Sequence, residues 1–195
     1  MVSAELRAVG DAFIYDIAVL LHVAELLGEE GMEARCDATG WTTRQTLGHL
    51  VANYERYAAL FGQRLAGEPI PPHGSDTDER NAMIAETERN TDPEVLLQRL
   101  QAARADIVQR LAAVSPAMER VEFGPGRPPL RELARAWSGH GASHAVDFLE
   151  AVPVLAEDAI VANWVFYPRD GEPASLHARR QTLLKQLRAN AKKGG

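Results

Sequence analysis

Two histidines on one side of a predicted helix are the residues with the clearest capacity for chemistry in this chain of 195 residues. In the stretch PLRELARAWSGHGASHAVDFLEA, residues 129–151, apolar residues and both histidines recur every three or four positions, which is the spacing of one helix face. Because His140 and His144 are four residues apart, we expect their Cβ atoms about 6 Å apart, so that two ring nitrogens can bind one metal ion. The members of this face are Leu130, Leu133, Trp137, His140, His144, Phe148 and Ala151.

A metal site of this kind needs a third ligand, and His49 is either that ligand or a histidine at the edge of the core. It lies early in a predicted helix over residues 42–66, at the border of the apolar face. Asn53, one turn after His49, and Asp147, one turn after His144, are candidates to orient the ligand rings from behind. Alternatively, the histidines only pack and form hydrogen bonds, although burying imidazoles among apolar residues is costly unless each has a partner.

Two other side chains are weaker candidates. His73 lies in the proline-rich and glycine-rich segment GEPIPPHGSDTD, residues 67–78, which follows the His49 helix and could fold over a site. Cys36 is the single cysteine, so the chain has neither a disulfide framework nor a cysteine metal cluster. We interpret Cys36 as a packed residue and expect it to be dispensable.

The elements that must position these residues are predicted to be helices, because the sequence contains no run of alternating β-branched residues. We expect an all-α antiparallel four-helix bundle over residues 1–152, followed by a helical C-terminal extension, residues 153–195, packed on it. A capping box formed by Thr91 and Glu94 is expected to restart the third helix within its span. The four predicted helices cover residues 3–27, 42–66, 78–115 and 129–151.

Charge and hydropathy exclude some classes of partner. A formal net charge of −6 disfavours nucleic acid, whose phosphates require a basic surface. The basic residues of the last third, Arg179 and Arg180 among them, are interpreted as a solvated helix face. No apolar run reaches the roughly 20 residues that span a bilayer, and the N-terminus does not resemble a signal peptide. We therefore expect a cytoplasmic protein that acts on a small molecule.

The segments GWTTRQTLGHLVANYERY and LRELARAWSGHGASHAVDFLEA also carry a resemblance to a known family. Their histidines and spacing resemble the DinB-like superfamily of metal-binding four-helix bundles. That superfamily includes the N-terminal domain of mycothiol-dependent maleylpyruvate isomerase, related thiol S-transferases and the ClbS/DfsB group. The resemblance spans about residues 3–151 and implies a divalent metal held by His49, His140 and His144.

The predicted function combines this resemblance with the chemistry of the residues. Three neutral imidazoles can hold zinc or nickel and leave positions open for substrate. The resemblance implies a transferase or isomerase that uses a low-molecular-weight thiol as cosubstrate, and a homodimer. A metal-dependent hydrolase and a non-catalytic metal-binding protein remain alternatives. The zinc-protease class is rejected, because its motif has a glutamate directly after the first histidine of the pair, where this chain has Gly141.

Overall fold

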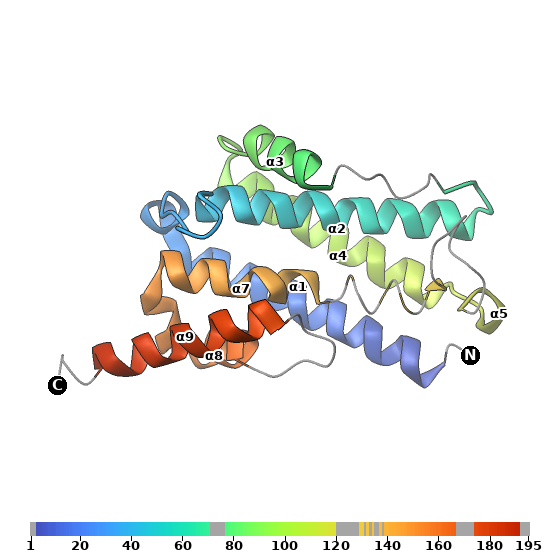
Figure 1. Ribbon diagram of the computed structural model, residues 1–195. Coiled ribbons are helices and arrows are strands. Elements are labelled where there is room, and N and C mark those ends of the chain that lie inside the picture. Colours follow the sequence, from blue (N-terminus) through green and yellow to red (C-terminus); the bar gives the residue numbers. More distant parts are fainter. Residues whose placement is uncertain are drawn as a thin grey trace.

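A computed structural model describes residues 3–70, 77–119, 129–130, 132, 134, 137, 139–166 and 174–191 of the chain (Figure 1). The named elements within these residues are all helices, and Arg35 and Thr42 form an isolated antiparallel bridge. The predicted all-α class is therefore confirmed.

Four helices form the bundle: α1 (Ala4–Met32), α2 (Thr43–Leu65), α4 (Pro93–Ala112) and α7 (His140–Ala151). Helix α2 packs against α4 and α7, and α1 packs against the same two helices. Their apolar faces meet in one buried core. Its largest fully buried side chains include Phe13, Ile17, Leu50, Tyr54, Phe61 and Phe148.

Local sequence signals explain how the first two helices begin and end. Gly28, the residue after the predicted first helix, has a positive φ of 58° and interrupts α1, which resumes and continues to Met32. Thr42 begins α2 with a capping box: its hydroxyl accepts a hydrogen bond from the Gln45 amide, and the Gln45 side chain accepts one from the Thr42 amide. This cap fixes the start of the helix that carries His49.

The predicted third element, residues 78–115, is two separate helices. Helix α3 (Thr77–Thr87) lies outside the bundle against α2, and α4 alone enters the bundle (Figure 1). The predicted capping box is wrong, because Asp92 caps α4 by accepting from the Glu94 amide at 2.8 Å. The Thr91 hydroxyl instead donates to Glu88, also at 2.8 Å. A short helix, α5 (Pro116–Glu119), follows α4.

The helix that carries the paired histidines is shorter than predicted. Leu130 and Trp137 are helical, but Gly139 forms a turn, and α7 starts at His140. The prediction of one unbroken helix over residues 129–151 is therefore wrong at Gly139. As a result, His140 stands in the first turn of α7 and His144 in the second.

Beyond α7, the chain forms a 3-10 helix, η1 (Pro153–Glu157), and two further helices, α8 (Ala159–Phe166) and α9 (Ala174–Ala191). Helix α8 buries Val161, Trp164 and Val165 and packs against α1 and α7, while α9 packs against α7. None of the described helices is long and apolar enough to cross a membrane.

Candidate metal centre

The three predicted ligand histidines converge between α2 and α7. One nitrogen from each of His49, His140 and His144 lies within 4.8 Å of the others. The Nε2 atoms of His49 and His140 are 3.2 Å apart, and the three ring centroids are 5.0 to 5.3 Å from one another. Two nitrogens bound tetrahedrally to one zinc ion lie about 3.4 Å apart, so this spacing suits a shared ion.

The protonation of these histidines also suits a divalent metal. Burial is the main cause that lowers the pKa of His49 to about 3, and the electrostatic effects of neighbouring His144 and Arg80 on a protonated His49 act in the same direction. Burial, together with the neighbouring His144 and His49, likewise lowers the pKa of His140 well below its ordinary value. Both rings are therefore neutral at neutral pH, which is the form of imidazole that binds a metal. The donor set fits zinc or nickel.

Asp147 orients the third histidine. Its Oδ2 atom lies 2.8 Å from His144 Nδ1, so Nδ1 carries the hydrogen and Nε2 keeps the lone pair for a ligand bond. Burial alone would raise the pKa of Asp147, but hydrogen bonds from His144 and Arg179 outweigh burial and lower that pKa. An ionised Asp147 therefore accepts from His144 at neutral pH.

Asn53 contacts the first histidine, as its spacing suggested. Its side-chain amide donates to the His49 carbonyl at 2.9 Å and lies 3.3 Å from ring atom Nε2. Both residues are buried within α2. Asn53 therefore limits how far the His49 ring can rotate.

Aromatic rings surround the histidines. Trp41, which precedes α2, has its ring 5.3 Å from that of His49. Tyr57 stacks on Trp137 at 4.4 Å and meets His140 edge to face at 6.1 Å. These three rings form an apolar wall beside His49 and His140.

A buried polar network supports the start of α7, and sequence reasoning missed it. The Tyr54 hydroxyl and the Trp164 indole both donate to the Asp16 carboxylate, the latter at 2.6 Å. The backbone N–H of Gly141 in turn donates to the Tyr54 oxygen at 3.2 Å. The sequence does contain a signal for this network. Asp16 follows Phe13 by three positions, which places a carboxylate on the apolar face of α1 among buried residues.

Other candidate residues lie away from the three histidines or outside the described chain. His73 lies outside the described residues. Cys36 is buried, with its Sγ atom 3.3 Å from Glu150 Oε2, and burial raises the pKa of its thiol. The interpretation of Arg179 and Arg180 as a solvated face is wrong: Arg180 is buried, and Arg179 contacts Asp147 at 2.8 Å.

A comparison with family models identifies the family of this chain. A family model described as the DinB superfamily matches residues 12–146, which include all three histidines. No curated protein and no solved structure matches the chain. The match spans more than half of the sequence, so the chain belongs to the DinB superfamily.

Proposed function

We propose that this protein is a divalent-metal-dependent enzyme that activates a low-molecular-weight thiol for a transfer or isomerisation reaction on a small electrophile. The observation that carries the proposal is the convergence of three imidazoles from α2 and α7, with nitrogens within 4.8 Å of one another. The resemblance to thiol-dependent members of the DinB superfamily supports the choice of a thiol as cosubstrate.

The charges around the histidines favour an anionic ligand. Zinc or nickel held by His49, His140 and His144 would supply the positive charge that lowers the pKa of a bound thiol or water. The three imidazoles contribute no negative charge, and the nearest carboxylate, Asp147, is paired with Arg179. An incoming thiol therefore gains stabilisation from losing its proton at this position, because the three imidazole ligands are neutral and leave the charge of the ion uncancelled.

The residues of the chain would then bind and orient the reactants. The aromatic wall of Trp41, Tyr57 and Trp137 offers a dry surface for an apolar electrophile. Cys36 is a poor protein nucleophile, because it is buried and burial raises the pKa of its thiol. The proposed reaction consequently requires no covalent intermediate with the protein.

The first experiment measures bound metal. Purified protein is expected to contain about one zinc or nickel ion per chain, and His140→Ala or His144→Ala should remove it, since two nitrogens hold such an ion poorly. His22→Ala is the matched control, because His22 belongs to α1 and is bonded to Asp158 at 3.0 Å. Undiminished metal in both ligand variants would refute the site and favour histidines that only pack.

The second experiment measures the reaction. Metal-loaded protein is tested with bacillithiol, mycothiol and glutathione against monochlorobimane, and separately with ester and amide substrates. We expect metal-dependent thiol conjugation that is lost in His49→Ala and retained in Cys36→Ser. Hydrolysis without a thiol requirement would instead identify a metal-dependent hydrolase. Bound metal with neither activity would favour the non-catalytic alternative.

A further inference from the structure

A second group of possible cation ligands lies directly behind the histidines. Ligand atoms of Cys36, Asp147 and Glu150 lie within 4.8 Å of one another. Cys36 Sγ is 3.3 Å from Glu150 Oε2 and 3.7 Å from Asp147 Oδ1. A thiol with two carboxylates is a donor set suited to a thiophilic divalent ion such as zinc or cadmium. Asp147 belongs to this group through Oδ1 and to His144 through Oδ2.

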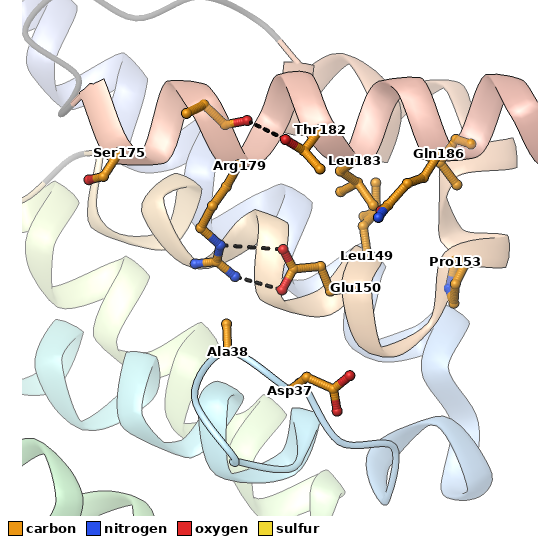
Figure 2. A pocket seen from close by; sticks show the side chains of 12 residues that line it. Asp37, Ala38, Leu149, Glu150, Pro153, Ser175, Arg179, Thr182, Leu183 and Gln186 are labelled. Carbon is orange, nitrogen blue, oxygen red and sulfur yellow. Dashed lines mark hydrogen bonds and ion pairs between the residues drawn. The ribbon is translucent and has the colours of Figure 1, made fainter.

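The positive charge in this group comes from the protein itself. Arg179 reaches down from α9, and its Nη2 atom lies 2.8 Å from Asp147 Oδ1, 2.7 Å from Glu150 Oε2 and 4.0 Å from Cys36 Sγ. Its Nε atom donates to Glu150 Oε1 at 3.3 Å, so the guanidinium and the Glu150 carboxylate meet through two bonds (Figure 2). The guanidinium thus contacts every member of the group.

We propose that Arg179 is a positioning residue that serves as the resident cation of the Cys36–Asp147–Glu150 group. By holding Asp147 Oδ1, it keeps Oδ2 directed at His144. By filling the space between the three donors, it keeps a second metal ion out of the group. The first role rests on the proposed metal centre, whereas the second depends only on Cys36, Asp147, Glu150 and Arg179.

Removing Arg179 has two physical consequences. Asp147 and Glu150 would become two neighbouring carboxylates without a counter-ion, and Asp147 would lose the bond that fixes its rotation. The group would also open to solvent, because Arg179 and Glu150 line a cavity of about 540 Å³ (Figure 2). Asp37, Ala38, Glu150, Ser175 and Arg179 are among the residues that line this cavity. A divalent ion could enter there and replace the missing charge.

The test counts metal ions per chain at saturating zinc or cadmium. Wild-type protein is expected to bind one and Arg179→Ala two, whereas the double variant Arg179→Ala/Cys36→Ser should return to one. Arg188→Ala is the matched control, since Arg188 is an exposed arginine of the same helix. With cobalt, a sulfur-to-metal charge-transfer band should appear in Arg179→Ala and be absent from wild type and from the double variant. Arg179→Gln keeps a polar side chain without the charge and should also gain the second ion. The test of the resident-cation role therefore does not depend on the stability of Arg179→Ala alone.

The positioning role is measured in the double variant, where the second group cannot compete for metal. Its affinity for the first ion should fall by about tenfold, the low end of the effect of residues that orient metal ligands, and Arg179→Lys should recover part of the loss. One ion per chain in both Arg179→Ala and Arg179→Gln would overturn the resident-cation role. Unchanged affinity in the double variant would overturn the positioning role. If wild type binds no ion at the histidines, the proposed function and the positioning role both fail, while a gained ion in Arg179→Ala would still support the resident-cation role.

Discussion

Replacing Gly141 with alanine should disturb both the stability of the bundle and the candidate metal centre. Gly141 lies immediately after His140 in the first turn of α7, where the helix touches the buried network below it. A methyl group there would stand 2.7 Å from the Tyr54 hydroxyl and 3.0 Å from a Leu20 methyl, and still closer to Asp16 Oδ2. Ordinary contacts of a Cβ atom are 3.4 to 4 Å. These three neighbours are buried, so none of them can move toward solvent.

The size of the effect follows from three contributions to the free energy of unfolding. Overpacking of a buried site typically costs about 1–3 kcal/mol. Displacing Tyr54 would weaken its bonds to Asp16 and to the Gly141 amide, at about 1–3 kcal/mol for a buried polar group that loses its partner. Alanine recovers about 1 kcal/mol through its better helix propensity. We therefore expect a net loss of about 3 kcal/mol, which lowers the melting temperature by about 6–12 °C in a chain of this size.

The assay compares Gly141→Ala with Gly139→Ala by thermal and urea unfolding of metal-free protein. Gly139 is the matched control, because a Cβ atom built there meets no heavy atom within 4 Å, and its φ of −96° suits any residue. We expect Gly139→Ala to stay within about 1 kcal/mol of wild type. Zinc affinity should also fall in Gly141→Ala, because α7 must move away from α1 and carry His140 with it. Equal stability of the two variants would refute the close-packing argument.

Three further predictions can be tested on the same protein. Tyr54→Phe should lower the free energy of unfolding by about 2 kcal/mol, measured by urea titration, because Asp16 and the Gly141 amide each lose a partner; a loss under about half a kcal/mol would contradict this. The pKa of His49 is lower in the folded state than in the unfolded state, so metal-free protein should lose stability as pH falls from about 6.5 toward 3. The contribution of His49 to this loss should be about 2 kcal/mol at pH 5, and His49→Gln should flatten the pH dependence. The homodimer implied by the family resemblance should give a dimeric mass by light scattering at micromolar concentration, and a monomeric mass would reject it.

The fold could be predicted to the level of class and helix order because its signals are local. The capping box of Thr42 and Gln45 begins α2, and Gly28 interrupts α1 through its positive φ. Both signals act within a few residues and use residue types that can be recognised in the sequence. The break at Gly139 was missed because the apolar spacing continues across it from Trp137 to His140. Periodicity reports which side of a helix is buried, but it does not show where one helix ends and the next begins.

The candidate site divides in the same way. His140 and His144 share one helix, so their spacing alone placed them side by side, whereas His49 required the family resemblance to be joined to them. Arg179 lies 32 residues from Asp147 along the chain, on a helix predicted only as an amphipathic extension. Its pairing depends on how α9 packs against α7, and no local pattern encodes that packing. Long-range polar contacts of this kind are therefore what the sequence leaves open.

The C-terminal extension holds α7 through polar bonds as well as apolar packing. Trp164 of α8 bonds to Asp16 beneath the start of the helix, and Arg180 of α9 donates to the Ala142 carbonyl at 2.9 Å. Arg179 holds Asp147 one turn later. The family match ends at residue 146, so all three donors, and Asp147 itself, lie outside it. The matched residues thus include the three histidines, whereas Asp147 and Arg179, which fix the orientation of His144, lie after the end of the match. We therefore expect the metal affinity of this chain to depend on Asp147 and Arg179 as well as on the three histidines.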